Sequence, residues 1–163
     1  MSNIERGRLA ALEDRVRVLE DHIDLYRLVC RWGAAADIGS GATAGALFTD
    51  DGVLEFEQTR VEGAAAVAEM IDSEGQKALV NQGCAHVQGL PMVHVDGDRA
   101  SATNYSHVYL HTDDGYEVWR VTANTWEFRR TEDGWRATRR TAHTIDGRPE
   151  ARALLARAFD GGV

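Results

Sequence analysis

Cysteine, basic charge and long apolar stretches are all scarce in this sequence of 163 residues. Its two cysteines, Cys30 and Cys84, have no metal-binding or redox spacing, so we expect both to be reduced residues of the core. No apolar run approaches the roughly 20 residues that a membrane-spanning helix needs. The first residues are charged and form no secretory signal. These absences predict a cytoplasmic protein with no membrane partner.

Positive charge is in the minority, with 18 Lys and Arg against 26 Asp and Glu, which gives a net charge of −8. A nucleic-acid partner is therefore not expected, because binding to phosphates needs a basic surface. The sequence also has no glycine-rich phosphate loop and no metal-binding motif, so we predict neither a cofactor nor a metal. What remains is a small molecule or a protein as the partner.

Helical patterns come first along the chain and strand patterns follow, an order typical of α+β proteins. We expect residues 1–163 to form a single domain, with a strongly curved antiparallel sheet packed over helices. The result would be a cone whose open end is a natural ligand pocket. The expected helices are 5–30, a second helix or a bend from Asp21 to Asp37, 43–48, 63–79 and 149–159, and the expected strands are 53–57, 86–95, 99–111, 117–130 and 135–145.

Apolar residues near the amino terminus recur alternately every three and four residues, which is the seam of a coiled coil or of a helix docked on a partner. A helix packed on its own domain fits the pattern about as well. We expect residues 1–20 to be a helical extension and the protein to form a homo-oligomer, either a dimer or a trimer. The seam residues are Leu9, Leu12, Val16, Leu19, Ile23 and Tyr26.

An acid–base pair is the best chemical candidate in the sequence. His86 begins an apolar strand, where a neutral imidazole could accept a proton near pH 7. Asp37 ends a helix, where negative charge is disfavoured unless a partner offsets it. A carboxylate bound to His86 would fix the imidazole tautomer and stabilise the imidazolium. The alternatives are a solvated turn residue for Asp37 and a core histidine for His86.

Two further histidines, His107 and His111, lie four residues apart on one strand and so share a face. His107 could contact a substrate, and His111 could be the acid that protonates a leaving hydroxyl. A half-solvated face is the alternative, and a metal site would need a third ligand that the spacing does not supply.

The last two strands also carry candidate binding residues. Thr122 and Asn124 alternate with apolar neighbours, and Asn124 is either a pocket group or half of a structural cross-strand pair. Arg139 and Arg140 face opposite sides of their strand, so one must face inward or toward an interface. An inward arginine could bind an oxyanion, although a salt bridge to Glu117, Glu127 or Asp37 is favoured. Trp32 and Phe56 are expected to line the core or the pocket.

The segments Trp32–Asp37 and Phe48–Glu57, His86 and the last strands together resemble the SnoaL-like, scytalone dehydratase-like branch of the nuclear transport factor 2-like superfamily. The resemblance covers roughly residues 18–145. It implies a cone-shaped, cystatin-like fold and a largely apolar small-molecule ligand, such as a polyketide, a terpenoid or a steroid-like compound.

Carried over position by position, the resemblance places the dehydratase's catalytic pair on Asp37 and His86 and its second histidine on His111. Its pocket serine and asparagine fall on Thr122 and Asn124, and the arginine of a related dehydrochlorinase falls near Arg140. Two tyrosines of the dehydratase fall on Ala36 and Phe56, and the lysine of the dehydrochlorinase falls on Trp32. The first departure changes how a substrate carbonyl would be polarised, and the second argues against chloride elimination by the route of the dehydrochlorinase.

The preferred hypothesis is a cofactor-independent acid–base enzyme, a dehydratase-like lyase, an isomerase or a cyclase. The alternative is a non-catalytic module of the same fold that binds a ligand or assembles with a partner, since one fold hosts many functions. A third hypothesis is a subunit that assembles with an oxygenase through its first helix.

Overall fold

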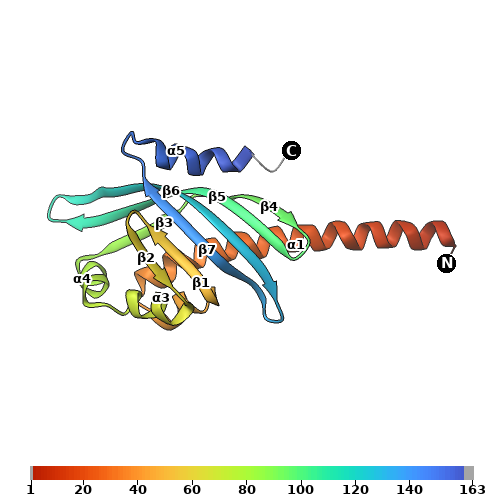
Figure 1. Ribbon diagram of the computed structural model, residues 1–163, viewed down its shortest axis with the longest axis horizontal. Helices are drawn as coiled ribbons and strands as arrows, with labels where there is room; N and C mark the ends of the chain where they lie inside the picture. The colour runs from red at the N-terminus through yellow and green to blue at the C-terminus, as the bar shows by residue number, and fades with distance from the viewer. Residues whose placement is uncertain (1, 160–163) are drawn as a thin grey trace.

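One long helix opens the chain in the computed structural model, which describes residues 2–159. Helix α1 runs without a break over Asn3–Asp37, and the side chains of Ser2 and Glu5 form a capping box at its start. Its first half projects away from the rest of the molecule (Figure 1). The bend or second helix expected near Asp21 is absent. The change in apolar pattern at that point instead marks where the exposed half of the helix gives way to the buried half.

A partly buried ion pair holds α1 at that transition. The Asp21 carboxylate accepts hydrogen bonds from Arg130 at 2.8 and 2.7 Å and from Nε1 of Trp135 at 3.0 Å. These partners lower the pKa of Asp21, chiefly through the hydrogen bond from Arg130, although burial opposes them. From Leu25 onward, one face of α1 packs against the sheet.

Three short helices follow the pattern predicted from sequence with shifted boundaries. Helix α2 covers Gly41–Gly45 and is capped by Ser40, and Phe48, expected in this helix, belongs to a strand. The single helix expected over 63–79 is two, α3 (Ala64–Ile71) and α4 (Glu74–Gln82). The break occurs because the Ser73 hydroxyl accepts a hydrogen bond from the backbone N–H of Gln76 at 3.3 Å and starts a new helix.

The seven strands form one sheet with the order β2-β1-β7-β6-β5-β3, and β4 also pairs with β5. The strand expected over 86–95 is interrupted at Pro91, which has no N–H for the ladder. Strands β1 and β7 pair in parallel, so the sheet is mixed and not wholly antiparallel as expected. The strands are β1 (Phe48–Phe56), β2 (Thr59–Glu62), β3 (Cys84–Gln88), β4 (Met92–Asp96), β5 (Arg99–Thr112), β6 (Gly115–Thr131) and β7 (Gly134–Thr144).

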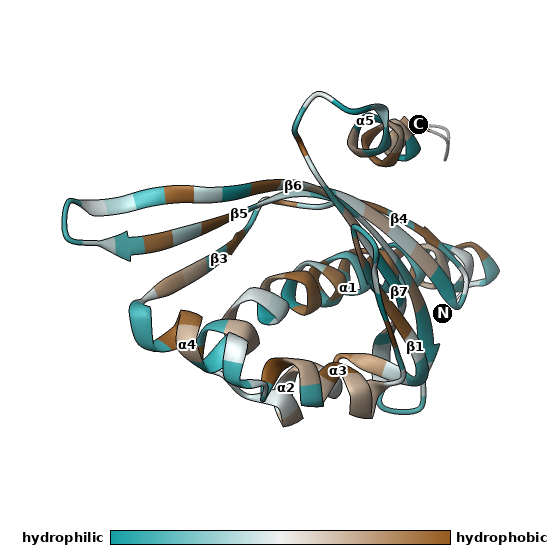
Figure 2. Cartoon of the chain, turned by 60° about the vertical axis from the view of Figure 1, so that its left-hand side comes forward, coloured by the Kyte–Doolittle hydropathy of each residue, from teal (hydrophilic) through white to brown (hydrophobic). Residues whose placement is uncertain are grey.

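The curved sheet has helices on both faces. Helices α1 to α4 lie on its inner side, and α5 (Pro149–Ala156) lies across the outer side of β6 and β7 (Figures 1 and 2). A short 3₁₀ turn, Arg157–Phe159, follows α5. This arrangement is the α+β cone that the element order predicted.

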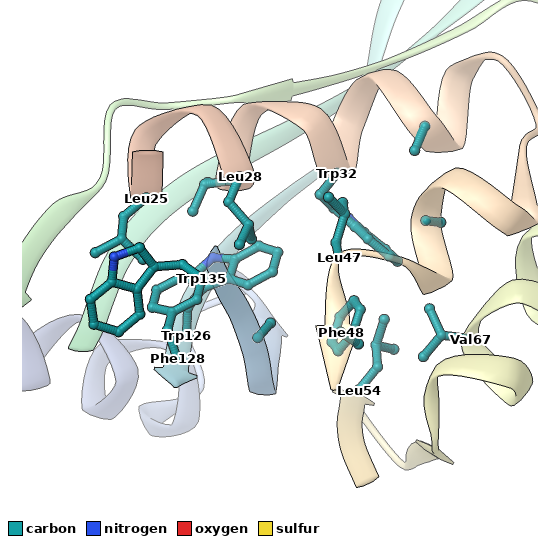
Figure 3. Packing of buried hydrophobic residues seen from close by; sticks show 14 of the residues in the cluster. Leu25, Leu28, Trp32, Leu47, Phe48, Leu54, Val67, Trp126, Phe128 and Trp135 are labelled. Atoms are coloured by element: carbon teal, nitrogen blue, oxygen red, sulfur yellow. The ribbon is translucent and has the colours of Figure 1, made fainter. Parts of the chain in front are cut away.

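The main core lies between α1 and the inner face of the sheet and is rich in aromatic side chains (Figure 3). Trp32 from α1 meets Phe48 and Trp126 edge-on, with ring centroids 5.8 and 6.4 Å away. Trp126 also stacks on Phe128 at 6.0 Å. This aromatic cluster forms the core on one side of Trp32. A cavity that Trp32 and His86 both line lies beside it.

Candidate active site

Asp37 and His86 are in direct contact. Nδ1 of His86 lies 2.6 Å from Oδ1 of Asp37, and the backbone N–H of His86 donates to both carboxylate oxygens at 3.0 and 2.9 Å. Because the carboxylate accepts from the ring, the arrangement favours a proton on Nδ1 and a free lone pair on Nε2. No residue among 2–159 makes a hydrogen bond to Nε2, and His86 lines a cavity of about 220 Å³.

Gly33 allows the two elements that carry this pair to approach each other. A Cβ at this position would lie 2.0 Å from the carbonyl oxygen of His86, so any larger residue would push β3 away from α1. The glycine, one turn before Asp37, had no assigned role in the sequence analysis. Its signal was a glycine inside a helical pattern, which often marks a close backbone approach.

Cys84 is the third group at this pair. Its thiol lies 3.7 Å from Oδ1 of Asp37 and donates a weak hydrogen bond to it. Burial and the neighbouring carboxylate raise the pKa of Cys84 to about 11, so the thiol is protonated at neutral pH. Asp37, Cys84 and His86 offer ligand atoms close enough together to hold a metal ion. A protonated, hydrogen-bonded thiol is an ordinary neighbour for the carboxylate, and we assign no metal. Cys30, expected in the core, is exposed.

The cavity is lined by apolar and aromatic side chains together with a few polar ones. Trp32, Phe56, Thr122 and Arg140, all named from sequence, contribute to its wall. Strands β3, β5 and β6 form part of the wall. His86 on β3 pairs with Val108 on β5, and Val108 pairs with Arg120 on β6. The cavity wall also includes Leu54, Met70, Ile71, Gln76 and Trp119.

Arg140 is the inward member of the arginine pair, and it is 9% exposed. Its Nη2 donates to Oδ1 of Asn124 at 2.7 Å, and its guanidinium lies 4.8 Å and 5.0 Å from the ring centroids of Trp32 and Trp126. Burial lowers the pKa of Arg140 to about 9, and the positive charge of Arg120 adds to this effect. The salt bridge expected for the inward arginine is absent among residues 2–159, whereas Arg139 pairs with Glu55 at 2.9 Å.

Asn124 is a structural residue that orients Arg140. Its amide also donates to Ser106 at 3.0 Å and to Thr122 at 3.3 Å, and Ser106 and Thr122 are 2.6 Å apart. Of the two roles left open from sequence, the cross-strand role is the observed one, because Asn124 is fully buried and does not line the cavity. Thr122 and Ser106 line the cavity.

Arg120 was missed from sequence. Its guanidinium lies 4.3 Å from the centroid of Phe56 and 4.8 Å from that of Trp119. The signal was its position two residues before Thr122, because alternate residues of a strand share a face. Burial lowers the pKa of Arg120, and the more distant negative charge of Glu57 opposes this shift.

His107 and His111 lie on the outer face of β5 and do not line the cavity. The ring of His107 is 6.1 Å from that of Tyr109, and the exposed His111 is 5.1 Å from Tyr116. The alternation that places Ser106 and Val108 inward places both histidines outward. This position gives no support to the acid role expected for His111 or to substrate contact by His107.

The sequence matches the SnoaL-like domain family model over residues 17–141. The chain belongs to this family. A nuclear transport factor 2-like protein with a cystatin-like fold from Novosphingobium aromaticivorans is 40% identical, with a TM-score of 0.88 over 90% of this chain and 96% of that one. These matches confirm the family resemblance and the cone-shaped fold that were predicted from the sequence.

Other solved structures are more distant. A protein from Novosphingobium aromaticivorans that is provisionally named an aromatic ring hydroxylase is 26% identical, with a TM-score of 0.60 over 78% of this chain and 90% of that one. A protein of unknown function from Mycobacterium tuberculosis is 20% identical, with a TM-score of 0.68 over 93% and 91% of the two chains, and shows the fold alone. No curated protein matches the chain.

The family and its neighbours support a SnoaL-like protein that binds a small molecule or acts on one. Within residues 2–159, no helix combines the length and the apolar character needed to cross a bilayer.

Proposed function

We propose that the protein is a cofactor-independent acid–base enzyme that removes a proton from an activated C–H group of a small molecule with a largely apolar body. The observation that carries this proposal is the Asp37–His86 hydrogen bond of 2.6 Å at the wall of a cavity of about 220 Å³. Asp37 holds the imidazole, and Nε2 of His86 is the base. The imidazolium so formed can return the proton to the product or to a leaving group.

Elimination of water, isomerisation and cyclisation all begin with this proton transfer, so the pair suits each of them. In the dehydratase two tyrosines hold a water molecule, and the resemblance places Ala36 and Phe56 in their positions, so a substrate carbonyl must be polarised by other groups here. Donors that remain at the wall are Gln76, Thr122 and Arg140. A non-catalytic binding module would have no need for a carboxylate that fixes the histidine tautomer, which is why we favour the enzyme.

Ring opening of 5-nitrobenzisoxazole tests this proposal without knowledge of the natural substrate. A base that removes its one acidic C–H proton causes the N–O bond to break and releases a coloured cyanophenolate. We expect saturable acceleration by the protein, about 10²–10⁴-fold over the same concentration of free 4-methylimidazole. A rate equal to that of free imidazole, with the protein folded, would contradict the proposal and favour the binding module.

We also propose that the chain forms a homo-oligomer through the first half of α1. Residues 3–20 of α1 are exposed throughout, so this stretch lacks the tertiary packing that stabilises most helices in proteins. This stretch and the turn that follows it carry a row of exposed apolar side chains: Leu9, Leu12, Val16, Leu19 and Ile23 are 46 to 63% exposed. The row has the 3.5-residue spacing of a two-helix seam.

For this seam, we expect Leu12→Lys with Leu19→Lys to shift the sedimentation coefficient from that of an oligomer to that of a monomer at micromolar concentration. Arg8→Lys with Arg15→Lys, off the seam of the same helix, is the matched control. A monomeric native protein, or an oligomer that survives the lysine variant, would show that α1 does not mediate assembly.

A further inference from the structure

Two arginines without a carboxylate partner in the described part of the chain face the cavity, Arg140 buried and Arg120 half-buried. Arg140 and Arg120 both line it, and no Asp or Glu does. Neither guanidinium forms an ion pair within residues 2–159, although the chain as a whole carries a net charge of −8. Desolvating a guanidinium costs free energy that is normally offset by a carboxylate. In this cavity that partner does not come from the described part of the chain.

The donors of both arginines are only partly used. Nε of Arg120 and Nε of Arg140 are buried and have no hydrogen-bond partner. Arg140 is more than nine-tenths buried and is fixed in place by Asn124 on one side and by the faces of Trp32 and Trp126 on the others. A buried donor left without a partner is costly, so such groups in a cavity commonly meet a ligand.

Glu57, the carboxylate whose charge acts on Arg120, does not fill this role. Glu57 accepts a hydrogen bond from the backbone N–H of Thr144 at 2.7 Å and from Arg148 at 3.1 Å. These partners, and His143 at 3.6 Å, lower the pKa of Glu57 and occupy its oxygens. Its charge reaches Arg120 only at longer range. The two guanidinia also repel each other, which an anion between them would relieve.

We propose that the cavity binds an organic monocarboxylate, with the carboxylate held by Arg120 and Arg140 and an apolar, aromatic-sized body placed between Phe56 and the helices. An inorganic anion would leave the apolar wall formed by Leu54, Met70 and Ile71 uncovered. That this acid is the substrate rests on the proposed function; that it binds does not.

The strand register gives the distance between the two ends of such a ligand. His86 lies opposite Val108 on β5, and Val108 lies opposite Arg120 on β6. Two strand spacings separate the backbones of His86 and Arg120 by about 10 Å. Both side chains extend into the cavity, so the carbon that loses its proton lies a few bonds from the carboxylate.

The test compares trans-cinnamate with its neutral isostere trans-cinnamamide by isothermal titration calorimetry. For the native protein we expect cinnamate to bind about 10- to 100-fold more tightly than the amide. In Arg120→Gln and in Arg140→Gln this preference should fall toward one. Arg139→Gln, the adjacent outward arginine, should keep it. Near-UV circular dichroism identifies any variant that does not fold. Arg120→Gln is expected to disturb folding less than Arg140→Gln, because Arg120 is only half-buried.

Equal affinities for the acid and the amide, no binding of either at 10 mM, or a preference that survives in folded Arg120→Gln would each overturn the inference. The proposed function is separable from it. His86→Gln should abolish the ring-opening reaction and leave the cinnamate preference intact. A preference without ring opening would leave an acid-binding module, and ring opening without a preference would leave a base acting on neutral compounds.

Discussion

Asp37→Asn should reduce the rate of 5-nitrobenzisoxazole opening about 10²-fold or more, to nearly the level of His86→Gln. The reason is the tautomer of His86. In the native protein the backbone N–H of His86 donates to the carboxylate at 2.9 and 3.0 Å, and Nδ1 contacts it at 2.6 Å. An asparagine offers these donors one neutral oxygen in place of two charged ones, so it no longer stabilises the imidazolium, and with its amide N–H₂ turned toward Nδ1 it favours the other tautomer.

In that orientation Nδ1 accepts a hydrogen bond from the amide, and the ring proton moves to Nε2, the atom proposed as the base. A histidine in that tautomer cannot accept a proton from the substrate. The change is nearly isosteric, so circular dichroism and the melting temperature should change little. His111→Gln on the outer face of β5 is the matched control and should retain the native rate. Retention of the native rate by Asp37→Asn would show that the carboxylate does not set the tautomer.

Asp21→Ala should lower the free energy of unfolding by about 2–4 kcal/mol. The substitution leaves Nε1 of Trp135 and two nitrogens of Arg130 without their acceptor, at a carboxylate that is 8% exposed. The cost is below that of a fully buried pair because Arg130 is 32% exposed and keeps Asp98 at 3.0 Å. Chemical denaturation at pH 7 measures the difference. Asp98→Ala, which removes an 82% exposed partner of the same arginine, should have little effect.

The same prediction has a pH signature. The folded-state pKa of Asp21 lies below its ordinary value of 3.8, so its contribution to stability is fully present above that value. The contribution is lost as the pH falls from 3.8 through the lower folded-state value, because the protonated carboxyl no longer pairs with Arg130. The gap in stability between the native protein and Asp21→Ala should therefore shrink below pH 3.8. A gap that is constant with pH would assign the effect to packing alone.

The sequence by itself determined the order of the main elements, the family and the pairing of Asp37 with His86; the short strand β2 was not predicted. Strand alternation, turn residues and helical periodicity are local signals, and they located the three long strands within two residues at their ends. Asp37 and His86 could be paired because each is unusual where it stands, one a charge at the end of an alanine-rich helix and the other a histidine opening an apolar strand.

The tertiary structure decided what depends on contacts between distant segments. The parallel pairing of β1 with β7, the close approach at Gly33 and the outward direction of His107 and His111 follow from how the sheet curves over α1. No local sequence pattern indicates whether Arg139 or Arg140 has a carboxylate as its ion-pair partner. Within residues 2–159, Arg140 and Arg120 face the cavity without a carboxylate partner. Glu57, whose charge acts on Arg120, is instead bound to Thr144 and Arg148, which only the packed chain decides.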